Sequence, residues 1–381
     1  MPQRHWTSWQ PPGQRENYIK RQNAIRRMKW SGAGIIFSMA MPVVLIYVYD
    51  IPHPDDLKKQ QAQEAQRAAA SGSNSLVPPS KAESPDDVAA TFHGRKVVIA
   101  PGGTKIVAQD EQTGAELELV PTGSDRIPHF PRTIHIESSS PAEASRPKNE
   151  QDTEYTLLGC GCRTVSFLSI KVYVVGLYVR TSSLQHLQAA LIHHINPLAS
   201  ALIPSEKEEL RKRLMDPEAS ARLWDTLLRD PESGLDAAFR IVPTRNTDFQ
   251  HLRDGWVRGI TDRTKQTVDA NRKDEYNDDS FGDTMRAFKS LLSGRGKAPQ
   301  GSVVLLTRDA DGTLGVRYQP KEGKGETTEL GKIEDDRLAR LIWLLYLGGK
   351  NVSSEAARGS IVDGVVHLAE RPVGTVETMV T

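Results

Sequence analysis

The chain has 381 residues, of which 38% are hydrophobic and 25% are charged, so it can hold one substantial domain with extensions or two small domains. Its 49 basic and 48 acidic residues give a net charge of +1, a balance that argues against nucleic acid as the main partner. The only two cysteines, Cys160 and Cys162, are one residue apart, which excludes a disulfide framework and a zinc site built from paired ligands. We expect both to be small packing side chains on one strand.

The N-terminal region combines a basic segment with a long uncharged one. Residues 1–30 carry seven lysines and arginines against the single acid Glu16. Residues 31–49, "SGAGIIFSMAMPVVLIYVY", carry no charge. As a helix they would span about 28 Å, close to the hydrocarbon thickness of a bilayer. The sequence therefore predicts a transmembrane helix over 31–49, with the basic segment on the side of synthesis or in a matrix.

The composition of the basic segment also predicts a compartment. An arginine-rich stretch that is nearly free of acids is typical of mitochondrial targeting. We therefore interpret residues 1–30 as a mitochondrial targeting and matrix segment. The expected location is the mitochondrial inner membrane, crossed once, with the C-terminal domain facing the intermembrane space. A plasma-membrane or reticulum anchor is the alternative.

Residues 50–152 have the composition of a largely disordered linker that contains a small β patch. The run "KKQQAQEAQRAAASGSNS" is polar and ends in flexible Gly and Ser residues. The runs "RKVVIAPGGTKIVA" and "AELELVPTG" alternate in hydrophobicity and are broken by turn residues, which predicts short strands. The run "ESSSPAEASRPKNEQD" is poor in apolar residues and predicts disorder.

The main domain is predicted over residues 153–376 and opens with "LGCGCRTVSFLSIKVYVVGLYVR". Both alternating sets of residues 171–179 are largely apolar, which predicts a central strand covered on both faces, preceded by a tight glycine turn. Amphipathic helices follow, and we expect Ser205 and Ser280 to act as N-caps. A hairpin around "RDADG", a buried helix "DDRLARLIWLLYLGG" and a final helix complete the chain. This order predicts the α+β class, a sheet with helices layered on it.

Three long motifs in this domain resemble the chalcone isomerase superfamily, and most closely its fungal mitochondrial branch. They are "GCGCRTVSFLSIKVYVVGLYV", "FRIVPTRNTDFQHLRDGWVRGITDRT" and "LIWLLYLGGKNVSSEAARGSIVDGVVHLAERPVGT". The resemblance implies an open-faced β-sandwich, in which helices pack on a large antiparallel sheet beside a cleft. The superfamily contains enzymes that close a chalcone into a flavanone, plastid proteins that bind fatty acids, and members without assigned catalysis, so the fold alone assigns no reaction.

The resemblance also points to five candidate ligand-binding positions. Arg163 matches an arginine that the enzymes keep, and a guanidinium beside an apolar cleft can clamp a phenolate or a carboxylate. The other enzyme positions carry larger or apolar residues here, namely Tyr173, Phe249, Trp256 and Leu345. Catalysis by positioned hydrogen bonds needs the whole polar set, so Arg163 alone would leave ketone and water unoriented. We therefore expect a domain without catalysis, and Arg163 is the catalytic residue if any activity exists.

Three functions remain open at this stage. The first is the binding of a fatty acid or another small amphipathic anion, with Arg163 and Tyr173 holding its charged end. The second is haem binding at the inner membrane, because His193 and His194 offer imidazole ligands on a helix. The third is a vestigial enzyme or a partner-binding scaffold. A true intramolecular lyase activity of the chalcone isomerase type is the alternative to all three. Haem is the one candidate cofactor, and the sequence points to no metal.

Overall fold

The computed structural model describes residues 91–92, 95–99, 106–109, 116–137, 152–165, 170–230, 233–265, 274–321 and 326–370. All of these belong to one compact unit, Lys81–Thr381. The predicted transmembrane helix over 31–49 and the basic segment 1–30 lie outside the described residues. Among the helices that are described, none is long and apolar enough to cross a membrane.

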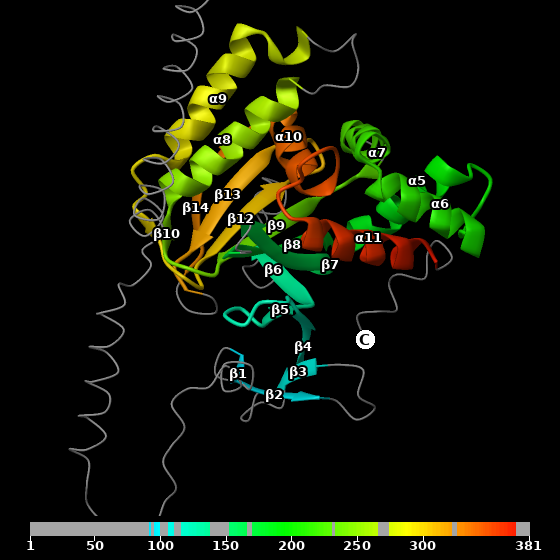
Figure 1. Cartoon of the computed structure of the whole chain (residues 1–381), viewed down its shortest axis with the longest axis horizontal. Coiled ribbons are helices and arrows are strands. Elements are labelled where there is room, and N and C mark those ends of the chain that lie inside the picture. Colours follow the sequence, from blue (N-terminus) through cyan, green and yellow to red (C-terminus); the bar gives the residue numbers. More distant parts are fainter. Residues whose placement is uncertain are drawn as a thin grey trace, which may run out of the picture. The chain divides into compact units, whose positions relative to one another are not determined.

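A seven-stranded antiparallel sheet forms the centre of the unit (Figure 1). Its strands, in spatial order, are β14 (Thr328–Ile333), β13 (Leu314–Gln319), β12 (Val303–Arg308), β9 (Ala237–Pro243), β8 (Ile170–Arg180), β7 (Asp152–Val165) and β6 (Thr133–Glu137). The strand predicted over 171–179 is β8, and it is interior to the sheet, as its two apolar faces indicated.

Helices cover one face of this sheet (Figure 1). They are η1 (Thr181–Ser183), α5 (Leu184–Ile195), α6 (Pro204–Met215), α7 (Pro217–Arg229), α8 (Phe249–Lys265), α9 (Asp279–Leu292), α10 (Asp336–Leu347) and α11 (Glu355–Ala369). The main core lies between the two layers, where Phe239 of β9 stacks against Trp343 and Tyr346 of α10 at centroid distances of 5.1 and 4.6 Å. A short pair, β10 (Thr247–Asp248) and β11 (Lys297–Ala298), stands beside them. The predicted α+β class is confirmed.

Two predicted helix caps are wrong. Helix α6 begins at Pro204, so Ser205 lies inside its first turn, and the Glu206 carboxylate accepts the Ile203 backbone N–H at 3.0 Å. Proline at the first helical position fixes this earlier start, because its ring presets the helical φ. Helix α9 is capped by Asp278, which accepts the Phe281 N–H at 2.7 Å, rather than by Ser280.

The opposite face of the sheet carries a second, smaller core. Its members come from alternate positions of β8, β9 and β12 together with β6, β7 and the β5 region; among them are Phe130, Cys160, Cys162, Val174 and Tyr178. Both cysteines are buried and neither forms a disulfide, as expected of packing residues. Burial, followed by the neighbouring Cys162, raises the pKa of the Cys160 thiol to about 12.

A five-stranded antiparallel meander precedes the main sheet. It consists of β1 (Thr91–Phe92), β2 (Arg95–Ile99), β3 (Ile106–Gln109), β4 (Glu116–Pro121) and β5 (His129–Pro131). Strands β2, β3 and β4 lie in the two segments whose alternation predicted a β patch. Strand β6 then pairs with β7, Ile134 opposite Tyr155, so the main sheet begins before residue 153.

The glycines at the start of the domain do not form a turn, contrary to the prediction. Strand β7 continues through them, and α11 lies directly against it. A Cβ atom at Gly159 would stand 2.5 Å from the Ile361 nitrogen, and one at Gly161 would stand 2.5 Å from the Ala357 nitrogen. These glycines therefore allow close contact between a strand and a helix.

Candidate functional site

Arg163 and Tyr173 face each other across the β7–β8 ladder. They are register partners in this antiparallel pair. The Arg163 Nη1 atom donates to the Tyr173 hydroxyl at 3.1 Å, and the guanidinium carbon lies 5.6 Å from the centre of the Tyr173 ring. Tyr173 is 5% exposed and belongs to the main core, so the pair lies on the helix-covered face of the sheet.

Two helices extend this pair into a buried chain of hydrogen bonds. The Tyr173 hydroxyl lies 3.1 Å from the Tyr346 hydroxyl of α10. The indole Nε1 of Trp256, on α8, donates to the same Tyr346 oxygen at 2.9 Å. Tyr346 is fully buried, so these contacts give its hydroxyl the partners that a buried polar group requires. The sheet and two helices thus meet at four connected polar side chains.

The central hydroxyl of this chain, that of Tyr346, resists ionisation. Burial raises the pKa of Tyr346 well above its ordinary value, and the adjacent Tyr173 raises it further. Trp256 can only donate, and Arg163 also donates, so the two hydroxyls accept from both ends. The arrangement therefore fixes the position of the Arg163 guanidinium through hydrogen bonds.

Arg163 is a half-buried cation without a counter-ion in the described part of the chain, where no carboxylate pairs with it. Burial lowers the pKa of its guanidinium, and the Tyr173 and Tyr346 hydroxyls more than offset this, so the net direction is upward. The group therefore stays charged. An unpaired guanidinium beside apolar core residues is a strong site for a carboxylate, which it can bind through two hydrogen bonds.

The structure brings together three of the five predicted residues: Arg163, Tyr173 and Trp256. Phe249 packs edge-on against Tyr318 of β13 at a centroid distance of 5.0 Å. Leu345 is buried against Gly259 of α8.

Sequence reasoning missed Tyr346, which stands one residue beyond Leu345 and supplies the central hydroxyl. Its signal was its placement in a fully buried helix, because the hydroxyl of a buried tyrosine must find a partner.

His193 and His194 lie in the last turn of α5, and both are exposed. Haem needs both an axial ligand and an apolar slot around it. The exposed pair offers the imidazole ligands but not the apolar surroundings. Haem binding at these residues stays a prediction. Elsewhere in the described ranges, no group of three or more histidine, cysteine, aspartate or glutamate residues is arranged to hold a metal ion.

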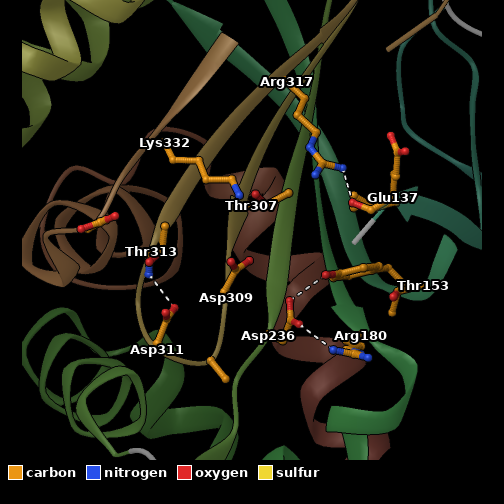
Figure 2. A pocket seen from close by; sticks show the side chains of 14 residues that line it. Glu137, Thr153, Arg180, Asp236, Thr307, Asp309, Asp311, Thr313, Arg317 and Lys332 are labelled. Carbon is orange, nitrogen blue, oxygen red and sulfur yellow. Dashed lines mark hydrogen bonds and ion pairs between the residues drawn. The ribbon is translucent and has the colours of Figure 1, made fainter. Parts of the chain in front are cut away.

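A separate polar pocket of about 620 Å³ is lined by residues of both edge strands of the main sheet, β6 and β14, and of the strands between them (Figure 2). It is lined by Ile136, Glu137, Thr153, Tyr155, Arg180, Asp236, Thr307, Asp309, Ala310, Asp311, Thr313, Arg317, Lys332 and Glu334. None of the residues around Arg163 is among them. Within the pocket, the Asp236 carboxylate accepts from the Tyr155 hydroxyl at 2.7 Å and from Arg180 at 3.4 Å.

An antiparallel sheet with helices packed on one face is the architecture that the resemblance implied. The family model described as "Chalcone isomerase like" matches residues 153–362, more than half of the chain. The chain therefore belongs to the chalcone isomerase-like family, and the resemblance seen in the motifs is confirmed.

Its curated relatives include two yeast proteins that carry one name, "Altered inheritance of mitochondria protein 18, mitochondrial". The Debaryomyces hansenii protein is 33% identical over 241 residues, covering 62% of this chain and 76% of its own length. The Kluyveromyces lactis protein is 32% identical over 234 residues, covering 60% and 70%. Among solved structures, a fatty-acid binding protein of Arabidopsis thaliana matches 69% of this chain and 98% of its own, with 19% identity and a TM-score of 0.42.

Proposed function

We propose that this protein is a membrane-anchored mitochondrial member of the family whose domain binds a fatty acid or another amphipathic anion without catalysing a reaction. Arg163 holds the anionic group, and Tyr173 orients the guanidinium. The apolar part of the ligand lies against the core side chains that surround this pair. A site of this kind, with one charged anchor in apolar surroundings, suits an acyl chain with a carboxylate.

The observation that carries this proposal is that the half-buried Arg163 guanidinium pairs with no carboxylate among the described residues. Keeping a half-buried guanidinium away from a carboxylate costs stability, because its lost hydration is not replaced by an opposite charge. Tyr173 contributes one hydroxyl, which satisfies one donor and adds no charge. An anionic ligand would supply the missing charge through charge-assisted hydrogen bonds.

The replaced neighbours support binding rather than catalysis. Phe249 has no hydroxyl, and Trp256 uses its single donor on Tyr346. At these matched positions, a chalcone bound at Arg163 would therefore lack the polar groups that orient its ketone and an attacking phenolate. We expect the purified protein to close a chalcone no faster than the spontaneous reaction. A rate clearly above it that disappears in Arg163→Gln would establish the lyase alternative instead.

The proposed location is supported by two observations of different kinds. The curated relatives are named as mitochondrial proteins. The basic segment 1–30 and the uncharged run 31–49 have the composition of a targeting segment and a membrane anchor. A single-pass inner-membrane topology with the domain in the intermembrane space would give protease access to the domain in mitochondria whose outer membrane is opened. Protection until the inner membrane is also dissolved would contradict this topology.

The bound ligand can be tested by what stays with the protein during purification. The full chain is purified in detergent, and its bound acyl compounds are quantified by organic extraction and mass spectrometry. We expect wild-type protein and the exposed-arginine control Arg258→Gln to retain the same carboxylate-bearing lipid. In Arg163→Gln the charge-assisted contact is lost, so the occupancy of this lipid should fall about tenfold or more. Equal occupancy in all three proteins would overturn the proposal.

A further inference from the structure

The polar pocket of Figure 2 is built from residues that the proposed lipid site does not use. Its walls come from β6, β7, β12, β13 and β14, from the end of β8, from the residue before β9 and from the β12–β13 turn. Five carboxylates line it, against three cationic side chains. At about 620 Å³ it has the volume of a small-molecule site.

One carboxylate of the pocket is satisfied and another is not. Asp236 receives hydrogen bonds from Tyr155 and Arg180. Asp309 is half-buried, and within the described part of the chain its side chain accepts no hydrogen bond and forms no ion pair. Only its backbone is bonded, to Thr313, Gly312 and the Arg308 side chain. Figure 2 shows Asp309 facing the pocket between Lys332 and Asp236.

The nearby cations are engaged elsewhere. Arg317 donates to the Glu137 backbone oxygen at 2.5 Å and reaches Glu329 at 3.5 Å. Lys332 lies 4.0 Å from Glu329 on the same strand, β14. Burial, then Asp236 and Asp311, raises the pKa of Asp309 to about 6, and Lys332 and Arg317 only partly oppose this. The negative charges around Asp309 therefore outweigh the effect of the neighbouring cations.

We propose that this pocket binds a small organic cation through a primary ammonium group seated on Asp309. An ammonium group donates three hydrogen bonds, and the Asp309 carboxylate with the hydroxyls of Thr307 and Thr313 provides acceptors on the pocket wall. A metal ion fits less well, because no three carboxylate, histidine or cysteine groups of the described residues converge as ligands. The pocket thus serves ligands of opposite charge to those expected at Arg163.

The test uses the full chain and 1,4-diaminobutane as the probe, measured by calorimetry. We expect saturable binding of the diamine and no binding of 1,4-butanediol, its neutral counterpart, with potassium chloride matching the ionic strength. Asp309→Asn should weaken diamine binding about tenfold or more, since a charge-assisted contact is lost. Glu208→Gln removes one exposed carboxylate from α6 and should bind like wild type.

A second variant gives an effect in the opposite direction. Lys332→Met removes the resident cation from the pocket wall, so diamine affinity should rise several-fold. Circular dichroism of both variants checks that they are folded. The proposal is overturned if the diamine does not bind saturably, if the diol binds equally, or if both Asp309→Asn and Lys332→Met bind with wild-type affinity.

Discussion

The hydroxyl of Tyr346 links α10 to β8 and to α8 inside the main core. It meets the Tyr173 hydroxyl of β8 and the Trp256 indole of α8 inside the core. Removing it leaves the Trp256 indole N–H without its acceptor and the Tyr173 hydroxyl without its partner, and an unsatisfied buried polar group costs about 1–3 kcal/mol. The chain of four side chains is therefore a stabilising feature as well as the support of Arg163.

Tyr346→Phe tests this role. The free energy of unfolding in urea should fall by about 1–3 kcal/mol, because two partners lose their contact and no volume is gained. Tyr276→Phe is the matched control, since its ring packs against Phe281 and no hydrogen bond of its hydroxyl occurs in the described residues. A Tyr346→Phe protein as stable as the Tyr276→Phe protein would show that the chain contributes nothing to stability.

Asp309 makes a second prediction, on the pH dependence of stability. Its folded-state pKa of about 6 lies above its ordinary value of 3.8, chiefly because of burial. Stability from this group is thus fully present below pH 3.8 and is lost as pH rises through 6. In the ligand-free protein, Asp309→Asn should therefore gain about 1 kcal/mol of unfolding free energy at pH 8, after allowance for partial exposure, and none at pH 4. Urea titrations at both pH values measure this, and an equal effect at both would contradict it.

Some residues of the two sites could be predicted from the sequence and others could not. Arg163 and Tyr173 could be identified because they match positions of the family motif, and the structure pairs them across adjacent strands. Tyr346 and Asp309 could not, since each acts through partners distant in the chain. Tyr346 lies in a helix whose apolar surroundings resemble plain core. Asp309 lies in a hairpin turn, where aspartate is common for local reasons.

At the scale of elements, the contact between β7 and α11 explains the glycines of "GCGC". A Cβ atom at Gly364 of α11 would overlap the Leu158 carbonyl, and Gly159 and Gly161 meet the helix from the strand side. This backbone contact positions the end of β7, where Arg163 stands. Sequence reasoning assigned these glycines to a turn, because close packing and turns are two uses of the same residue. The helical stripes and the central strand were predictable, since their apolar periods come from local sequence.

Two glycines of α11 form a natural pair for testing this contact. Gly364→Ala should lower the melting temperature by roughly 10 °C or more, because the new methyl group forces helix and strand apart. Gly359→Ala on the same helix meets nothing within 4 Å and should be neutral or slightly stabilising, because alanine favours the helix. Thermal unfolding followed by circular dichroism compares them. If Gly364→Ala melts with the wild type, the backbone contact does not constrain the fold.

At the scale of the molecule, the sheet separates two environments. The helix-covered face holds the hydrogen-bond chain that ends at the Arg163 cation, and a separate acidic pocket around Asp309 is lined by residues of β6, β7, β8, β12, β13 and β14. The class and the family motifs were accessible from the sequence. The joining of β6 to the main sheet was not, since its pairing with β7 depends on residues separated by a long segment. The two proposed sites carry opposite charges, a cation at Arg163 and a carboxylate at Asp309. We therefore expect the charged end of a ligand to decide which site it occupies.

The proposed role of Arg163 is to hold the anionic end of an amphipathic ligand. The binding of a fluorescent fatty acid to the full chain measures this role. We expect saturable binding to wild type and to Arg258→Gln with the same Kd. In Arg163→Gln the Kd should rise about tenfold or more, and in Tyr173→Phe it should rise less, because tyrosine only orients the guanidinium. The methyl ester of the same fatty acid should bind weakly to all four proteins. An unchanged Kd in Arg163→Gln, with the ester bound as tightly as the acid, would show that Arg163 does not bind the carboxylate.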